Sequence, residues 1–344
     1  MLHQISLSIE DGRNIEISYM NVLITTIPFG QIDTLPIEIL KKNNINYTIN
    51  PIGRKLTENE LFNLVPEYDI LIAGTEPITK KVIENNTNLK MISRVGIGLD
   101  SVDLLCAREH DINVSYTPDA PSSAVSELAF GMIFNLVREV HKSNIQLHNG
   151  TWERYFGSRV KNLTIGVVGA GRIGMGLVNH LINFGVEKIL VNDIDHSILF
   201  PKNCNLVDKD FLLKNSDVIS LNVPLTKDTF GMIGEREFRL MKDSAFIINT
   251  SRGGIINEDD LFFALSKKII RGAAVDTFEI EPYYGKLCQL DNCLLTSHMG
   301  SMSYDCRGKM EIEATEEVIR FINSEKLLNS VPDFEYENQE LKSK

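Results

Sequence analysis

The sequence has no run of about 18 or more apolar residues, the length that spans a bilayer as a helix. Its first residues, Met-Leu-His-Gln-Ile-Ser, also lack the charged segment and apolar core of a secretory signal. Lys and Arg form no long cluster, and the formal net charge is −11, so no basic patch for a nucleic-acid backbone is evident. We therefore expect neither a membrane nor a nucleic acid as partner.

Cysteine is scarce and scattered, with five residues of which no two form a Cys-x-x-Cys pair. An odd, dispersed set argues against both a disulfide framework and a zinc site. The sequence therefore predicts reduced thiols in a cytoplasmic protein without a metal. With 344 residues, of which 43% are apolar and 24% charged, the chain is long enough for two domains with substantial cores.

Short apolar strands alternate with helical segments from Asn21 onwards, which predicts an α/β fold with parallel sheets covered on both faces. Thr57-Glu-Asn-Glu60 resembles a capping box at a helix start. A long helix is expected over Ser122–His148, while the first 20 residues could add a strand or an arm. The charged stretch 333–344 is poor in apolar residues and is expected to be a mobile tail.

The segment Thr164–Gly174 is the most informative part of the chain, because an apolar strand leads into a glycine-rich turn and a helix. Gly169, Gly171 and Gly174 occupy the three glycine places of the dinucleotide-binding fingerprint. The first allows a tight turn, the second close approach to a pyrophosphate, and the third close helix–strand packing. This context favours a dinucleotide site over an ordinary surface turn.

Asp193 follows the next apolar strand, near the spacing expected for the acid that binds a ribose hydroxyl. A carboxylate there accepts hydrogen bonds from the ribose diol of NAD and repels the 2′-phosphate of NADP. The residues that follow, Ile194, Asp195 and His196, include no Arg or Lys. The sequence therefore predicts NAD as the cofactor.

Three polar residues lie just beyond late strands, namely Arg252, Glu281 and His298. Ligands in open parallel sheets bind at the carboxyl ends of strands, so these side chains would share an edge with the cofactor. A His can donate and accept a proton near neutral pH, a carboxylate can orient it, and an Arg can grip a substrate carboxylate.

Each of the three also has an ordinary structural interpretation. Arg252 could form a surface ion pair, His298 could be held by backbone groups, and Glu281 could be solvated. Asp276 ends an apolar strand and needs a partner if it is buried, either a cofactor amide or a loop N–H. Their joint placement beside the glycine fingerprint favours the catalytic interpretation.

Six motifs together resemble those of the D-isomer-specific 2-hydroxyacid dehydrogenases, in order and spacing over about residues 21–332. They are Arg94–Asp103, Val168–Gly174, Leu221–Thr226, Ile248–Gly254, Ala274–Pro282 and Thr296–Ser301. The resemblance implies a discontinuous, flavodoxin-like substrate domain (1–119 and 302–332) around an inserted NAD-binding Rossmann domain (120–301). It also implies a homodimer formed through the Rossmann domain.

The resemblance implies roles for individual residues as well. Arg252, Glu281 and His298 would be catalytic, and Arg94 with the Val95–Gly96 backbone, together with Arg252 and His298, would bind the substrate. Asp276 would hold the nicotinamide amide. The NAD site would comprise Gly169, Gly171, Arg172, Ile173, Gly174, Asp193, Val223, Pro224, Thr250, Ser251, Asp276, His298 and Gly300.

Within this family the chain looks most similar to phosphoglycerate dehydrogenases, so D-3-phosphoglycerate is the first expected substrate. Those enzymes often carry an Arg-Ser pair before the helix at Thr79–Asn86, where this chain has Ala73-Gly-Thr-Glu-Pro77. Glyoxylate or hydroxypyruvate reduction, another D-2-hydroxy acid and phosphite oxidation therefore stay open. An alternative of another class is an NAD(H)-sensing, corepressor-like binding protein.

Overall fold

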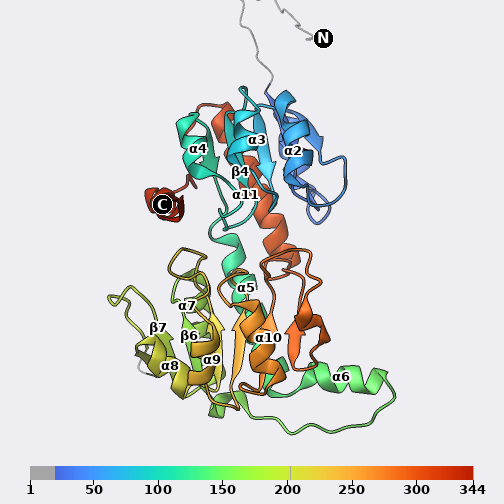
Figure 1. The fold of residues 1–344 in the computed structure, drawn as a ribbon. Coiled ribbons are helices and arrows are strands. Elements are labelled where there is room, and N and C mark those ends of the chain that lie inside the picture. The colour runs from blue at the N-terminus through green and yellow to red at the C-terminus, as the bar shows by residue number, and fades with distance from the viewer. Residues whose placement is uncertain (1–19, 202, 344) are drawn as a thin grey trace, which may run out of the picture. The chain divides into compact units, whose positions relative to one another are not determined.

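The computed structural model describes residues 20–201 and 203–343, and the strand or arm expected in the first 20 residues lies almost wholly outside this range. The chain divides into two compact units (Figure 1). Unit 1 comprises the residues up to Thr117 and Glu311–Pro332, and unit 2 comprises Pro118–Met310 and the residues from Asp333. The sequence analysis placed the boundaries at 119/120 and 301/302.

Unit 1 is built on a five-stranded parallel sheet in the order β2-β1-β3-β4-β5, which is the flavodoxin-like order. The capping box expected at Thr57 is confirmed, since the Thr57 side chain and Glu60 each accept the other's backbone N–H at the start of α2. Its elements are β1 (Asn21–Ile24), α1 (Leu35–Lys42), β2 (Asn46–Ile49), α2 (Glu58–Leu64), β3 (Ile70–Ala73), α3 (Lys80–Glu84), β4 (Met91–Arg94), α4 (Leu104–Glu109) and β5 (Asn113–Ser115).

Unit 2 is built on a seven-stranded parallel sheet in the order β12-β11-β10-β9-β6-β7-β8. Its sheet elements are β6 (Thr164–Val168), α7 (Arg172–Phe184), β7 (Lys188–Asn192), β8 (Cys204–Leu206), α8 (Lys209–Asn215), β9 (Val218–Leu221), α9 (Glu235–Leu240), β10 (Phe246–Asn249), α10 (Glu258–Ser266), β11 (Gly272–Val275) and β12 (Cys293–Leu295). Helix α11 (Tyr304–Ile322) contains the boundary between the units. Two parallel sheets with helices confirm the predicted fold class.

Both faces of the larger sheet are buried, because alternate residues of each strand point to opposite sides. Ile219 and Ile247 belong to the core cluster under α8, α9 and α10, whereas their neighbours Val218 and Ile248 belong to the cluster under α5 and α7. With hydrophobic cores on both faces, polar ligands can reach the sheet at the carboxyl ends of its strands.

The long helix expected over Ser122–His148 is instead two helices, α5 (Ala120–Val137) and α6 (Val140–His148). Glu139 lies between them in the left-handed conformation, with φ of 53°. Its buried carboxylate accepts hydrogen bonds from Arg271, at 2.8 Å, and is 3.1 Å from the Lys142 ammonium. This buried ion-pair cluster fixes the break, which the local sequence pattern does not reveal.

Helix α5 has the length and composition of a membrane-spanning helix, with a mean hydropathy of 1.2 over 18 residues. Just over half of that window, 56%, is buried inside the protein, where α5 packs against α7 and strands β10 and β11. This burial is that of a core helix. The expected tail, in turn, contains the helix α12 (Asp333–Ser343), which its charged composition did not predict.

Candidate active site

The glycine-rich turn between β6 and α7 has the geometry that each glycine place requires. Gly169 has a φ of +87°, and a Cβ there would lie 2.6 Å from the Asn222 carbonyl oxygen. A Cβ on Gly174 would lie 1.9 Å from the Gly169 carbonyl oxygen. A Cβ on Gly171 would meet no atom within 4 Å, so open space lies at the N-terminus of α7. The turn therefore leaves room for a phosphate where the helix dipole favours one.

Asp193 ties the end of β7 to this turn. Its Oδ2 accepts the Ala170 N–H at 2.5 Å, and its Oδ1 accepts the Asp195 N–H at 2.8 Å. These bonds hold the half-buried carboxylate beside the glycine turn, as a ribose ligand requires. Arg172 pairs with Asp119 at 2.7 Å, and both side chains are exposed, so this ion pair restrains Arg172 only weakly.

Thr250, directly after β10, is buried, yet its hydroxyl has no hydrogen-bond partner in the described part of the chain. An unpaired buried hydroxyl is costly, which fits a ligand that supplies the missing partner. Ser251 differs, because its hydroxyl already donates to the Leu221 carbonyl at 2.6 Å. Val223 is half-buried and packs on Gly169, and Pro224 is exposed.

His298 and Glu281 form a hydrogen-bonded pair after strands β12 and β11. His298 Nδ1 lies 2.9 Å from Oε2 and 3.0 Å from Oε1 of Glu281. Because a carboxylate accepts, Nδ1 carries the proton, and Nε2 remains to exchange a proton with a ligand. The imidazole side chain is 37% exposed, so a ligand can reach it.

Asp276 fixes the loop that carries His298. Its fully buried carboxylate accepts the Thr296 hydroxyl at 2.6 Å and the Met299 and Gly300 amides at 2.9 Å each. The sequence suggested a cofactor amide or a loop N–H as the partner of Asp276, and in the structure two loop N–H groups donate to it. His298 itself has a φ of 50°, and its N–H donates to the Asp276 carbonyl at 2.8 Å.

The loop that carries Arg252 packs on the loop that carries Glu281 because Gly253 has no side chain. A Cβ on Gly253 would lie 2.0 Å from the Phe278 carbonyl carbon, so the loop after β10 packs directly on the loop after β11. Phe278 in turn donates its N–H to Glu281 at 3.2 Å. The half-buried Arg252 donates to the Ser251 carbonyl at 2.7 Å and is placed at the same sheet edge.

The substrate contacts expected in unit 1, Arg94 and the Val95–Gly96 backbone, lie at and just after the end of β4. Most of their hydrogen-bonding groups already have partners within the protein. Arg94 is only 5% exposed, and its guanidinium donates to the Val95 carbonyl. The Val95 amide donates to Ala73 at 2.9 Å and the Gly96 amide to Thr117 at 2.8 Å. The next two amides, of residues 97 and 98, have no acceptor among the described residues.

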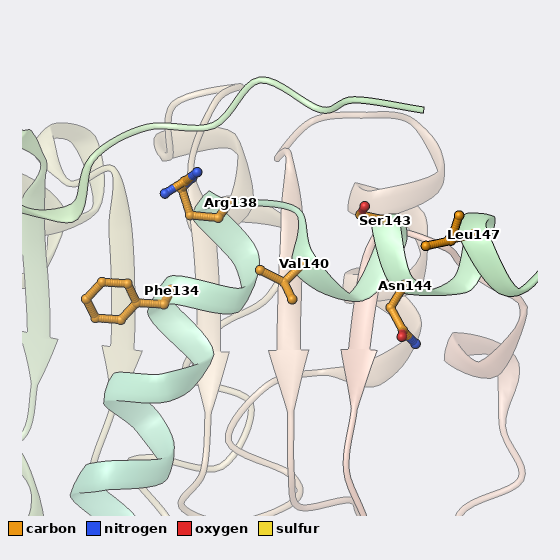
Figure 2. A pocket seen from close by; sticks show the side chains of 6 residues that line it. All are labelled: Phe134, Arg138, Val140, Ser143, Asn144 and Leu147. Atoms are coloured by element: carbon orange, nitrogen blue, oxygen red, sulfur yellow. The ribbon is translucent and has the colours of Figure 1, made fainter. Parts of the chain in front are cut away.

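A hollow of about 540 Å³ lies at the junction of α5 and α6, and Figure 2 shows its side chains. None of the expected site residues lines it, so it is separate from the dinucleotide and His298 sites. Its lining residues are Phe134, Arg138, Val140, Ser143, Asn144 and Leu147.

Comparison with known proteins agrees with this geometry. Residues 130–300 match the NAD-binding domain of D-isomer-specific 2-hydroxyacid dehydrogenases. A hydroxypyruvate reductase from Thermotoga maritima is 35% identical over 272 residues, covering 77% of this chain and 88% of that relative. A D-3-phosphoglycerate dehydrogenase from Synechocystis is 33% identical over 293 residues, 83% of this chain but only 52% of its own length. The crystal structure of the TT0316 protein from Thermus thermophilus has a TM-score of 0.83 at 28% identity, over 91% of this chain and all of that one.

Proposed function

The chain belongs to the D-isomer-specific 2-hydroxyacid dehydrogenases, a family of NAD-dependent oxidoreductases, and we propose that its reaction centre is Arg252, Glu281 and His298. The observation that carries the proposal is the bond of 2.9 Å between Glu281 and His298 Nδ1, which leaves Nε2 for the substrate. NAD, when bound, supplies or accepts the hydride at C2 of the substrate.

In the reductive direction, His298 Nε2 gives a proton to the C2 oxygen of a 2-keto acid. Glu281 holds the imidazole in the correct tautomer and stabilises its charged form. Arg252 presents two coplanar donors to the substrate carboxylate and polarises the carbonyl. The product is a D-2-hydroxy acid, and the oxidative direction reverses each of these steps.

The residues fit an NAD molecule on two independent observations, the open space at Gly171 and the unpartnered Thr250 hydroxyl. We propose that the amides of the glycine turn bind the pyrophosphate and that Asp193 binds the ribose diol. In this proposal Asp276 acts on the cofactor site through the Met299–Gly300 loop that it holds.

Replacement of Asp193 by Ala is expected to weaken NAD binding and to relax discrimination against NADP. The carboxylate that accepts from the ribose diol is lost, and so is its repulsion of a 2′-phosphate. Measured kcat/KM ratios for NADH against NADPH test this, with Asp195→Ala, two residues further along the chain, as a matched control. An unchanged ratio in Asp193→Ala would remove this residue from the ribose site.

For the substrate, we propose a small 2-keto acid without a phosphate, such as hydroxypyruvate or glyoxylate, ahead of the phosphorylated acid. The guanidinium of the buried Arg94 already donates to the Val95 carbonyl. In the segment Ala73–Pro77, where related enzymes often have an Arg-Ser pair, the buried Glu76 carboxylate accepts the Gly74 amide at 2.9 Å. A carboxylate there repels a second anion. We further propose that the free amides of Ile97 and Gly98 bind the substrate carboxylate.

A panel of 2-keto acids tests the proposal, with NADH oxidation followed by absorbance. It should include hydroxypyruvate, glyoxylate, pyruvate and 3-phosphohydroxypyruvate. Turnover on the first two with little on the phosphorylated acid is the expected outcome. Preference for 3-phosphohydroxypyruvate would restore phosphoglycerate as the substrate, and NADH binding without turnover of any acid would favour an NAD-sensing role.

We also propose that the chain forms a homodimer through residues 140–157, which we call the arm. The arm is the part of unit 2 between α5 and the point where the Ser158 amide donates to the Val137 carbonyl at 3.0 Å. Its apolar side chains are unusually exposed, with Trp152 at 80% and Phe156 at 95%. Exposed apolar clusters of this kind are typical of protein interfaces.

Light scattering is expected to give twice the mass of one chain, and Trp152→Glu with Phe156→Glu is expected to give the monomer. A charge at each position would have to be buried without a partner in the interface. Leu328→Glu, which changes an exposed apolar residue outside the arm, serves as the control. A monomeric parent protein, or a dimer that persists in the double variant, would refute this interface.

We propose a cytoplasmic location because none of the five cysteines, all of which lie within the described residues, forms a disulfide. Burial raises the pKa of the Cys293 thiol to about 12 and also raises that of Cys204. Both thiols are therefore protonated and unreactive at neutral pH.

A further inference from the structure

Unit 1 contains a cluster of three side chains that the proposed reaction does not use. Cys106 and His110 lie one turn apart at α4, and Glu84 lies at the end of the adjacent helix α3. Their sulfur, nitrogen and carboxylate oxygen atoms all lie within 4.8 Å of one another. Cys106 is buried, whereas Glu84 and His110 are exposed above it, so the cluster is open to solvent on one side.

The geometry points to a binding site for a zinc-like divalent cation formed by Glu84, Cys106 and His110. The Cys106 Sγ to His110 Nδ1 distance is 3.6 Å. Zinc bonds of about 2.3 Å to sulfur and about 2.0 Å to nitrogen place these ligands roughly 3.5 Å apart in a tetrahedron. Thiolate and imidazole donors favour zinc over magnesium or calcium, and a carboxylate is also a common zinc ligand.

The charges of the cluster suit a divalent cation. On binding, a divalent cation would displace the proton of the Cys106 thiol, and the resulting thiolate and the Glu84 carboxylate would together neutralise its two positive charges. The carboxylates of Asp103 and Glu109 add negative charge near the Cys106 sulfur, and the Lys80 ammonium adds one positive charge. Burial, and then Asp103, raise the pKa of this thiol, an effect that a bound cation opposes.

The existing contacts of the three ligands are weak enough to be replaced. Glu84 pairs with Lys80 at 3.5 Å, and both side chains are about half exposed, so the ion pair contributes little. His110 Nδ1 lies 2.9 Å from the Cys106 carbonyl oxygen, so coordination through this nitrogen would exchange that hydrogen bond for a bond to the cation. Three protein ligands leave the fourth position to water, as in zinc sites that are not closed.

Metal content after zinc loading and desalting tests the site on the full chain. We expect about one zinc per chain to be retained, and Co²⁺ to give the near-ultraviolet charge-transfer band of a cobalt thiolate. Cys106→Ser should abolish that band. His110→Gln, at an exposed position where folding is not at risk, should weaken zinc binding by about tenfold or more, since even outer-shell changes cost about 10–100-fold.

Two matched variants control for zinc bound elsewhere. Cys288→Ser removes an exposed thiol and His196→Gln an exposed imidazole, and both should keep the cobalt band and the zinc. The inference is overturned if the parent protein retains no zinc, if His110→Gln binds it with equal affinity, or if the band follows Cys288. Because metal content is the readout, the test does not depend on any substrate.

Discussion

Replacement of His298 by Asn is expected to lower kcat for 2-keto acid reduction by about 10²–10⁴ while NADH binding persists. The side chain loses the nitrogen that donates the proton, whereas the cofactor contacts proposed for the glycine turn and Asp193 are untouched. Asn is chosen over Ala because residue 298 has a φ of 50°, and Asn adopts this left-handed conformation more readily than most residues.

Single-turnover kinetics together with NADH titration by fluorescence separate the two effects. His110→Asn, a change at the exposed histidine that follows α4 and lies outside the proposed cofactor and substrate contacts, is the matched control and should leave both quantities unchanged. If the variant at position 298 kept a kcat near that of the parent protein, His298 could not be the proton donor. If NADH binding were lost as well, a structural role in the Asp276 loop would explain the defect instead.

The position of the proposed catalytic residues at one sheet edge could be predicted from sequence because strand ends carry positional information. Each of Arg252, Glu281 and His298 follows an apolar run, and parallel strands bring their carboxyl ends to one edge. The spacing of Gly169, Gly171 and Gly174 likewise encodes backbone geometry directly, since a Cβ at the last position would lie 1.9 Å from a carbonyl oxygen. Local patterns suffice where the physical constraint is local.

What the sequence did not reveal depends on partners that are remote along the chain. The break at Glu139 is stabilised by Arg271, and no pattern near the break predicts that ion pair. The amides of Val95 and Gly96 are occupied by Ala73 of β3 and by Thr117 after β5, which a motif cannot show. Each case is a hydrogen-bond assignment that only the folded chain determines.

The cluster of Glu84, Cys106 and His110 illustrates a different limit of prediction from sequence. The absence of Cys-x-x-Cys pairs predicts no metal, whereas the proposed zinc site rests on Cys106 and His110, which have the spacing of one helical turn. That spacing alone is weak, because many helices carry a cysteine and a histidine in this relation. The third potential ligand, Glu84, lies on a second helix, α3, so the cluster becomes evident only in the folded chain.

Replacement of Arg252 by Lys is expected to lower kcat/KM for the 2-keto acid by roughly 10²–10³, the loss typical when one preorganised donor to a developing oxyanion is removed. Lys keeps the positive charge but offers a point charge in place of two coplanar donors. If Arg252 both grips the carboxylate and polarises the carbonyl, KM should rise and kcat should fall together.

The matched control is Arg239→Lys, an exposed position on α9 where the guanidinium pairs with Glu235 at 2.7 Å. It makes the same chemical change away from the catalytic edge, and kcat/KM should stay unchanged. The backbone of Gly253 packs against Phe278, whose N–H donates to Glu281. The Arg252→Lys substitution does not change Gly253, so this packing should be preserved. A variant that loses only stability, with kcat and KM intact in the folded fraction, would assign Arg252 to the structure and not to the reaction.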